Sequence, residues 1–253
     1  EKIDYRMDEE QVPDRVHIYK VESPVKDKLE SLGLLLRSLG DQSTIVFLNY
    51  RDSVERTNKY LVEQGFSTSF FHGGLEQKER EASLYRLSNG SANILVSTDL
   101  ASRGLDIPDI DNIIHYHMPE SEDGYIHRVG RTARWEAQGR AFFLLGPEEH
   151  IPDYVDAEVE DYEIPAVEEL PMPAKPKMAT IYIGKGKKDK ISKGDILGFL
   201  CKKGGLNSSE IGKIDVNDRY AYAAIARPKL RSVLNNVKGE KIKGVKTIVE
   251  EVR

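Results

Sequence analysis

The sequence predicts an α/β fold in which helices flank a parallel sheet, followed by a small α+β domain. Short β-rich runs alternate with amphipathic helical stretches up to about residue 150. Runs such as Thr-Ile-Val-Phe-Leu at 44–48 and Ile-Leu-Val-Ser at 94–97 are continuously apolar, as expected for strands buried on both faces. From about residue 178 a second set of elements begins, in the order βαββαβ.

The first region is expected to alternate strands with helices, because β-branched and aromatic runs are separated by stretches with apolar residues at helical spacing. The clearest helix carries leucines at 29, 32, 35, 36 and 39. The strands are expected at 16–21, 44–48, 68–72, 93–97, 112–116 and 140–145, and the helices at 25–38, 53–64, 76–87 and 121–129. Ligands bind beyond the carboxyl ends of parallel strands, so the loops that follow these strands are candidate functional sites.

The second region is shorter and has its own pattern. We expect a strand at 180–183, a helix at 192–203, strands at 211–216 and 220–226, a helix at 229–237 and a strand at 245–250. This order is the split βαβ arrangement. Residues 151–177, between the two regions, are acidic and contain several prolines, so we expect them to form an extended linker.

Charge is distributed unevenly along the chain. The net charge is −5 over 253 residues. Acidic residues exceed basic ones by 6 in residues 1–140 and by 10 in residues 141–174, whereas basic residues exceed acidic ones by 11 in residues 175–253. The overall sign argues against a nucleic-acid-binding protein, but the basic last third favours one.

The composition excludes several classes of protein. The single cysteine, Cys201, excludes an intramolecular disulfide framework and CxxC zinc sites, and the six histidines are scattered, so no metal site is predicted. No run approaches the roughly 20 apolar residues of a membrane span, so we expect a cytoplasmic protein without membrane contact. Because the first residue is Glu1 rather than Met, we expect the chain to be a piece of a longer protein.

Three arginines form the most specific pattern. Arg128, Arg131 and Arg134 are spaced three apart in the segment 125–134, so they share one face of a helical turn. Such a concentration of positive charge needs an anionic partner, and guanidinium groups match phosphate oxygens well. A solvated basic helix end is the alternative for an isolated triplet of this kind.

The segment 95–110 runs from an apolar strand into a polar loop. Gly104 lets the backbone approach a ligand closely, and Asp106 can accept a hydrogen bond from a ribose hydroxyl or pair with an arginine. The alternative for a Ser/Thr/Asp loop after a strand is a helix cap. In the segment 70–80, Gly73 and Gly74 precede a helix, whose free amides can hold a phosphate; a simple turn is the alternative there.

Together these segments resemble the second RecA-like lobe of DEAD-box RNA helicases, over roughly residues 15–150. The matching segments are Ile45-Val46-Phe47-Leu48-Asn49-Tyr50-Arg51, His72-Gly73-Gly74 with Gln77 and Arg80, Ser97-Thr98-Asp99 through Arg103-Gly104-Leu105-Asp106, and His127-Arg128-Val129-Gly130-Arg131-Thr132-Ala133-Arg134. Two positions depart from the family pattern. Ala133 replaces the commoner glycine, and Tyr50 stands where Thr is frequent, so we assign Tyr50 no contact.

The resemblance implies a role for each matching residue. Arg131 and Arg134 would reach the γ-phosphate of ATP as arginine fingers, and Gly104 and Asp106 would bind the nucleotide. The implied RNA contacts are Arg51, Gly73, Arg80 and Thr98, and the residues implied to couple the RNA and ATP sites are Asp99, Arg103, His127 and Arg128. Residues 1–14 would form a segment between the lobes.

The sequence has neither a GxxxxGK[ST] phosphate loop nor an Asp-Glu-Ala-Asp stretch. In the family these elements belong to the first lobe, which holds most of the ATP and its Mg²⁺. The resemblance therefore implies that this chain carries half of a composite active site. We expect it neither to hydrolyse ATP nor to unwind RNA by itself.

Residues 178–253 resemble an RNA-recognition-motif fold and, within it, the DbpA-type RNA-binding domain of bacterial DEAD-box proteins. In this fold aromatic side chains of two strands stack on bases. The candidates are Tyr182, Tyr220 and Tyr222, and the alternative is a buried tyrosine pair on the helix-facing side. A lysine-rich stretch after the first strand offers another surface, so binding through the sheet and through a basic face both stay open. Its candidate phosphate contacts are Lys185, Lys187, Lys188 and Lys190.

The function that these observations favour is the C-terminal part of a bacterial DbpA/DeaD-like ATP-dependent RNA helicase, acting as a monomer. The family implies structured RNA as substrate, with large-subunit ribosomal RNA and ribosome assembly as the expected setting. Two alternatives remain: a non-enzymatic RNA-binding or annealing module, and a DNA helicase lobe of the same superfamily. The RNA-type C-terminal domain disfavours the second of these.

Overall fold

The computed structural model describes residue 12 and residues 15–133 and 138–253. The chain divides into two compact units. The first comprises Glu1–Ser83 and Asn93–Lys175, and the second comprises Leu84–Ala92 and Pro176–Arg253. The segment 1–14, predicted to lie between lobes, falls almost entirely outside the described residues.

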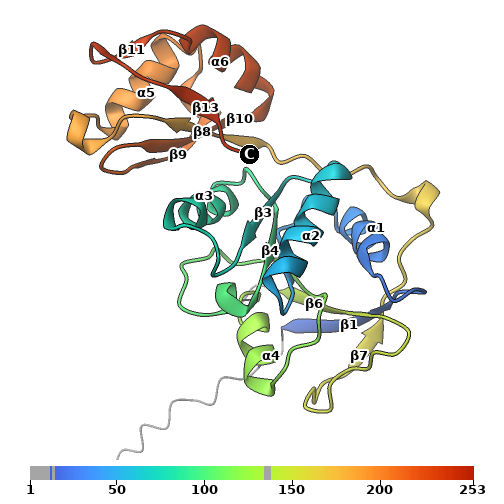
Figure 1. Ribbon diagram of the computed structural model, residues 1–253. Helices are drawn as coiled ribbons and strands as arrows, with labels where there is room; N and C mark the ends of the chain where they lie inside the picture. Colours follow the sequence, from blue (N-terminus) through green and yellow to red (C-terminus); the bar gives the residue numbers. More distant parts are fainter. Residues whose placement is uncertain (1–11, 13–14, 134–137) are drawn as a thin grey trace, which may run out of the picture. The chain divides into compact units, whose positions relative to one another are not determined.

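The first unit is built on a seven-stranded parallel sheet with the strand order β3-β4-β2-β5-β6-β1-β7 (Figure 1). The strands are β1 (Val16–Glu22), β2 (Thr44–Phe47), β3 (Thr68–Phe71), β4 (Ile94–Ser97), β5 (Asn112–His115), β6 (Gly139–Leu145) and β7 (Val159–Asp161). Every residue of β2, β4 and β5 is buried, which confirms that the continuous apolar runs mark strands covered on both faces.

Helices cover both faces of this sheet. The helices are α1 (Leu29–Leu39), α2 (Arg51–Glu63), α3 (Gln77–Ser88), the short 3₁₀ helix η1 (Asp99–Ser102) and α4 (Glu122–Val129). The last residues of α3, from Leu84 on, are counted with the second unit. The leucines of α1 pack with Val46, Val96 and Phe142 on one face. On the other face, Tyr125 of α4 packs on Phe143. The predicted parallel sheet with flanking helices is therefore confirmed, and helices and strands agree with the predicted ranges to within a few residues.

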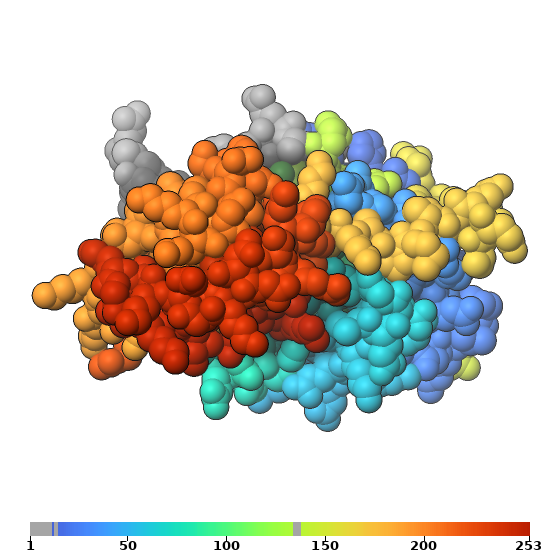
Figure 2. Space-filling view, turned by 90° about the horizontal axis from the view of Figure 1, so that it is seen from above, coloured from blue at the N-terminus to red at the C-terminus, as the bar shows by residue number. Residues whose placement is uncertain are grey.

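The acidic segment between the two regions contains a strand that the sequence did not predict. β7 pairs in parallel with β1, so that Ile18 lies opposite Val159. Further along, Leu170 is buried, and the Arg37 side chain of α1 donates to the carbonyl oxygens of Leu170 and Pro171. Figure 2 shows this segment in yellow beside the blue surface of the first helix. β7 has only three residues, and two of them are acidic and exposed. Such a short strand shows no alternation of apolar and polar residues, so the sequence pattern did not predict it.

The second unit has a four-stranded antiparallel sheet in the order β13-β8-β10-β9. Its strands are β8 (Met178–Ile183), β9 (Ile211–Val216), β10 (Ala221–Ala226) and β13 (Val249–Glu251), and its helices are α5 (Lys193–Lys202) and α6 (Leu230–Val237). The helices pack on the sheet face that carries Ile181, Ala223 and Ile225, with Phe199 and Val233 in the same core. The predicted βαββαβ order is confirmed.

The last predicted strand, 245–250, is wrong in detail. The structure has a two-stranded hairpin, β11 (Lys241–Ile242) with β12 (Val245–Lys246), before β13 pairs with β8. Lys243 and Gly244 form the turn, with φ of 50° and 75°. Positive φ at both turn residues is the geometry of a tight two-residue hairpin. The chain therefore reverses direction just before residue 245, and β12 covers only the first two residues of the predicted strand.

Candidate functional site

The segments at the carboxyl edge of β2, β3 and β4 bring the four predicted RNA contacts of the first region together. Arg51 is the first residue of α2, and its guanidinium group lies directly on the backbone of Gly73. A Cβ atom placed on Gly73 would lie only 2.7 Å from Nη2 of Arg51. Arg80 donates from Nη2 to the Gly73 carbonyl oxygen at 2.7 Å and from Nε to that of Leu75 at 3.0 Å. The Thr98 amide, after β4, donates to the Phe71 carbonyl oxygen at 3.3 Å. We call Arg51, Gly73, Arg80 and Thr98 the phosphate cluster.

His72 fixes the glycine loop of the phosphate cluster. Its ring is buried, and Nδ1 accepts a hydrogen bond from the Gly74 amide at 3.0 Å. Nε2 lies 2.9 Å from Oε1 of Glu55 on α2. Because Nδ1 is an acceptor, Nε2 carries the proton and donates to the carboxylate. The sequence pattern placed His72 in a motif but did not indicate this positioning role.

Arg128 of α4 is fully buried and connects three loops. Its guanidinium group donates to both carboxylate oxygens of Asp99, at 2.6 and 3.1 Å. It also donates to Oδ1 of Asn49 at 2.7 Å and to the His117 carbonyl oxygen at 2.8 Å, and lies 3.3 Å from Nδ1 of His115. The loops after β2, β4 and β5 are thus joined to α4. We call these five residues the arginine hub.

Two other residues with a predicted coupling role meet at the exposed side of α4. Arg103 forms an ion pair with Asp123. Nδ1 of His127 lies 2.8 Å from the Asp123 carbonyl oxygen and 3.4 Å from its carboxylate. Both Arg103 and Asp123 are more than half exposed, so this pair contributes little to stability. It nevertheless connects the loop after η1 to the helix that leads to Arg131.

The side chain of Arg131 is buried against the loop that carries the predicted nucleotide contacts. Its Nε donates to the Ser102 carbonyl oxygen at 3.1 Å, and its Nη1 donates to that of Leu105 at 2.9 Å. Gly104 between them has a φ of +65° with no atom near its missing Cβ, and Asp106 is exposed on the same loop. An open backbone, a carboxylate and a guanidinium group fit the ribose and phosphates of a nucleotide. Arg134 lies outside the described residues.

The two histidines of the arginine hub, the buried His115 and the half-buried His117, are held uncharged. Burial, with the Arg128 charge nearby, lowers the pKa of His115 far below its ordinary value. Burial, with the charges of Lys28 and Arg128, lowers the pKa of His117 to about 4. The Nδ1 atom of His117 accepts a hydrogen bond from the Asn49 amide at 2.9 Å, so its proton is on Nε2.

Lys28 is a buried charge that the sequence pattern did not reveal. Its Nζ atom donates to the carbonyl oxygens of Tyr116 and Leu144 at the ends of β5 and β6, and it pairs with Glu149 at 2.6 Å. Burial lowers the pKa of this lysine, and the pairing opposes the shift. In the sequence Lys28 is one of several charged residues before a helix, so no pattern distinguished it.

The three predicted tyrosines of the second unit lie on the sheet face opposite the helices. Ring centroids are 5.8 Å apart for Tyr182 and Tyr220 and 6.0 Å apart for Tyr182 and Tyr222. Tyr222, however, is only 3% exposed, because Tyr85 of the same unit stacks on it at 5.1 Å. Stacking of Tyr222 on a base stays a prediction. The alternative of a tyrosine pair on the helix-facing side is wrong, because Ala223 occupies that side. Tyr182 and Tyr220 are half-buried.

The predicted lysines form an ordered turn after β8. Lys187, Lys188 and Lys190 are exposed, and Lys185 is half-buried. The amides of Lys187 and Lys188 donate to the carbonyl oxygens of Asn217 and Asp218, each at 2.8 Å, which anchors the turn. Lys243 of the hairpin donates to the Lys190 carbonyl oxygen, and so adds a fifth lysine that the sequence pattern did not assign. We call these five residues the lysine surface.

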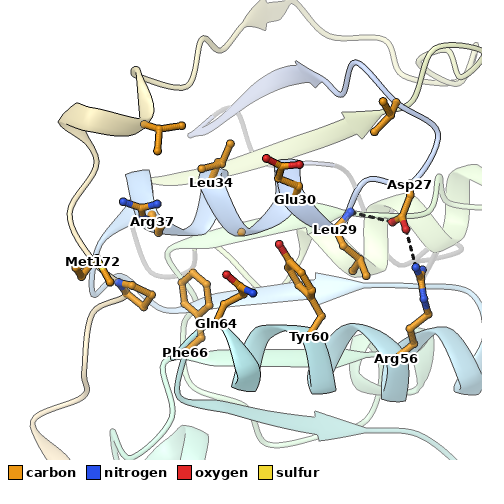
Figure 3. A pocket seen from close by; sticks show the side chains of 14 residues that line it. Asp27, Leu29, Glu30, Leu34, Arg37, Arg56, Tyr60, Gln64, Phe66 and Met172 are labelled. Carbon is orange, nitrogen blue, oxygen red and sulfur yellow. Dashed lines mark hydrogen bonds and ion pairs between the residues drawn. The ribbon is translucent and has the colours of Figure 1, made fainter.

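Two cavities open on the first unit. One, of about 660 Å³, lies between α1, α2 and residues 167–173, with Tyr60, Phe66 and Met172 among its walls (Figure 3). None of the predicted site residues lines it. The other, of about 1000 Å³, is lined by the start of α2, the end of β5 and the loops at 26–28 and 146–149.

Among the residues that the structure describes, no helix has the length and apolar character needed to cross a bilayer. Within the same residues, no three His, Cys, Asp or Glu side chains are grouped in a way that could hold a metal ion.

Two families match consecutive parts of the chain. Residues 27–136 match the helicase conserved C-terminal domain, and residues 180–251 match the DbpA RNA binding domain. The chain is 34% identical over 228 residues to the ATP-dependent RNA helicase DbpA of Escherichia coli (strain K12), covering 88% of this chain and 50% of that protein. It is 29% identical over 245 residues to DbpA of Bacillus subtilis (strain 168), covering 87% and 51%.

The chain thus spans about half the length of these relatives. Among solved structures it resembles the E. coli DEAD-box protein SrmB bound to regulator of ribonuclease activity A. The two are 30% identical with a TM-score of 0.55, over 64% of this chain and 97% of that one. A DEAD-box protein from Methanococcus jannaschii shares the fold at 24% identity with a TM-score of 0.54, over 60% of this chain and 43% of that one.

Proposed function

Since this chain belongs to the DEAD-box RNA helicase family, in the part that joins the helicase C-terminal domain to a DbpA RNA-binding domain, we propose that it supplies the second lobe and the RNA anchor of an ATP-dependent RNA helicase. The single observation that supports this most strongly is the arginine hub. Arg128 connects the loop that bears Arg51 to the helix that precedes Arg131. The hub therefore joins loops next to the predicted RNA contacts to the helix that precedes a predicted nucleotide contact.

ATP, with Mg²⁺ held mainly by the first lobe, supplies the phosphoryl chemistry when bound. In this chain, Asp106 would accept from the ribose and Gly104 would let the backbone approach the nucleotide. Arg131 would exchange the carbonyl oxygens of Ser102 and Leu105 for phosphate oxygens. Charge-assisted hydrogen bonds to phosphate are stronger than bonds to neutral carbonyl oxygens, so this exchange is favourable. Arg134 would act beside Arg131.

Single-stranded RNA would lie across the phosphate cluster. Arg51 is exposed, and Arg80 and His72 hold the glycine loop against it. Contacts to the RNA backbone carry no sequence information, so this part would bind any strand. The target would be selected by the second unit, and the lysine surface is its proposed contact with structured RNA. Large-subunit ribosomal RNA, in ribosome assembly, is the proposed target.

The test of the proposed activity is a fusion of this chain to a first RecA-like lobe that carries the phosphate loop. We expect RNA-stimulated ATP hydrolysis by the fusion and none by this chain alone. Arg131→Ala should lower the rate by about 10³-fold or more, the scale of an arginine finger. Arg140→Ala is the matched control, because Arg140 bonds to Asn112 and Gln42 at the other end of the strands. Equal rates for both variants would refute the assignment of Arg131.

The lysine surface is tested by binding of an RNA hairpin over a range of salt concentrations. Replacing Lys187, Lys188 and Lys190 by Gln should reduce the slope of log K against log salt by up to about 0.9 for each phosphate that these lysines neutralise. The control replaces Lys202 and Lys203, exposed at the other end of α5, by Gln. Equal affinity for the matched DNA hairpin would favour the DNA helicase alternative. Annealing without ATP, together with an inactive fusion, would favour the non-enzymatic module.

A further inference from the structure

An exposed aromatic ring lies at the end of the phosphate cluster. Tyr50 directly precedes Arg51 and is 62% exposed. It lies at the N-terminus of α2, and its ring meets the His117 ring edge-on, with centroids 5.6 Å apart and planes at 63°. The sequence pattern gave Tyr50 no contact. An edge-on neighbour leaves a tyrosine face available for stacking, and stacking on a base needs such a face.

His117 is also a wall of the 1000 Å³ cavity, so this cavity begins next to Tyr50. Ser53 and Thr57, three and seven residues after Tyr50 along α2, line the same cavity. Pockets for small organic groups have volumes of about 300–1000 Å³, so a nucleobase fits within it. Tyr116 and Pro147 contribute apolar surface, while Ser53 and the Nε2 proton of His117 offer hydrogen-bonding groups.

The positive and negative charges that line this cavity are equal in number. Its walls carry three cationic and three anionic side chains, and His117 is uncharged at neutral pH because its pKa is about 4. Four of the charges form two ion pairs, Lys28 with Glu149 and Arg56 with Asp27, each at 2.6 Å. The remaining two are Lys26 and Glu148, of opposite sign. A neutral polar group suits such a cavity better than a phosphate does, whereas Arg51 next to it suits the phosphate.

We propose that this cavity binds one nucleobase of single-stranded RNA, with Tyr50 stacking at its entrance and Arg51 holding the attached phosphate. The inference rests on the proposed function, because Arg51 must hold an RNA strand for the base to reach the cavity. It adds a base-binding site to a lobe otherwise expected to contact only the RNA backbone. A nucleobase that belongs to a free nucleoside has the same chemistry, so the test must separate the two sources.

The experiment is photo-crosslinking of the intact 253-residue chain to a single-stranded oligonucleotide that carries one 4-thiouridine, with the adducts mapped by mass spectrometry. We expect adducts on the peptides that contain Tyr50 or Tyr116 and His117. Peptide mapping separates these from adducts of the second unit. An oligonucleotide with an abasic residue at the thiouridine position keeps every phosphate. In competition, it should displace the crosslinking strand from these peptides roughly tenfold less well than the intact strand.

Tyr50→Ala should remove this difference between the intact and abasic competitors, and Tyr50→Phe should keep it, because Phe retains the ring. Millimolar adenosine should not compete if the base belongs to the RNA strand; full competition would identify a free nucleoside as the ligand and overturn the RNA assignment. Equal displacement by intact and abasic strands in the unmodified chain would also overturn the proposal, while leaving the proposed function intact. Failure of Arg51→Ala to weaken crosslinking to the first unit would refute the RNA contact assigned to Arg51 in the proposed function, and with it the base-binding inference that rests on that contact.

Discussion

The replacement of Arg128 by Met tests whether the arginine hub holds the first unit together. Arg128 is fully buried, and its partner Asp99 is 45% exposed. Breaking a buried ion pair by removing one partner costs about 3–5 kcal/mol, mainly because the remaining charge stays buried. The half-exposed Asp99 regains water, which lowers the cost, whereas the Asn49 and His117 oxygens lose a charged donor. We therefore expect a decrease of about 3 kcal/mol in the free energy of unfolding.

Native-state hydrogen exchange is the appropriate assay, since it reads opening free energies separately for different helices. For Arg128→Met, α4 should lose about 3 kcal/mol of protection while α6 of the second unit stays unchanged. Arg128→Lys should recover less than half of this protection, because an ammonium group cannot reproduce the planar fork that reaches Asp99, Asn49 and His117 at once. Arg140→Met, at the opposite end of the strands, should cost less than about 1 kcal/mol. Equal effects of Arg128→Met and Arg140→Met would refute this reasoning.

Further predictions concern pH, glycine and a buried lysine. His117 has a pKa lowered to about 4, so its contribution to stability is present above pH 6.5 and is lost as the pH falls toward 4. Because its ring is partly exposed, urea denaturation should show the free energy of unfolding decrease by only about 1 kcal/mol between pH 7 and 5. This decrease should be smaller in His117→Asn. Gly198→Ala in α5, where a Cβ meets no atom within 4 Å, should raise the melting temperature through a gain of about 1 kcal/mol. Gly139→Ala, whose Cβ would overlap the Thr132 side chain, should lower the melting temperature. Lys28→Met should destabilise the first unit by about 3 kcal/mol in urea titrations, and an unchanged stability would show that its three hydrogen bonds contribute nothing net.

Hydrophobic periodicity predicted the framework because burial on both faces leaves a direct mark on the sequence. The runs at 44–48 and 94–97 became neighbouring central strands, and the leucines of α1 became the core of one face. β7 was missed because a three-residue acidic strand carries no such mark. The hairpin at 241–246 was missed because its turn uses Lys243 at positive φ, which is rare for lysine and not visible from composition.

The residues of the candidate site were named from the sequence, but the contacts between their side chains were not. The resemblance to the DEAD-box family implied Arg51, Gly73 and Arg80 as RNA contacts, and the structure brings these three residues together. Pairwise contacts across the sheet, such as Arg128 with Asn49, depend on which strands become neighbours, and local sequence does not encode that. The same reason explains Tyr222, whose burial depends on Tyr85 from a distant segment.

The position of β7 has a consequence for solubility. A strand at the edge of a sheet presents unpaired backbone groups that can recruit another chain, and charged, very short edge strands discourage this. β7 is three residues long, and it places Glu160 and Asp161 beside β1, whose own sequence is apolar at Val16, Ile18 and Val21. We therefore expect the acidic segment to prevent the β1 edge from pairing with a strand of another chain. A chain shortened to end near residue 150 would keep the folded sheet but expose the β1 edge, and it should self-associate at concentrations where the longer chain does not.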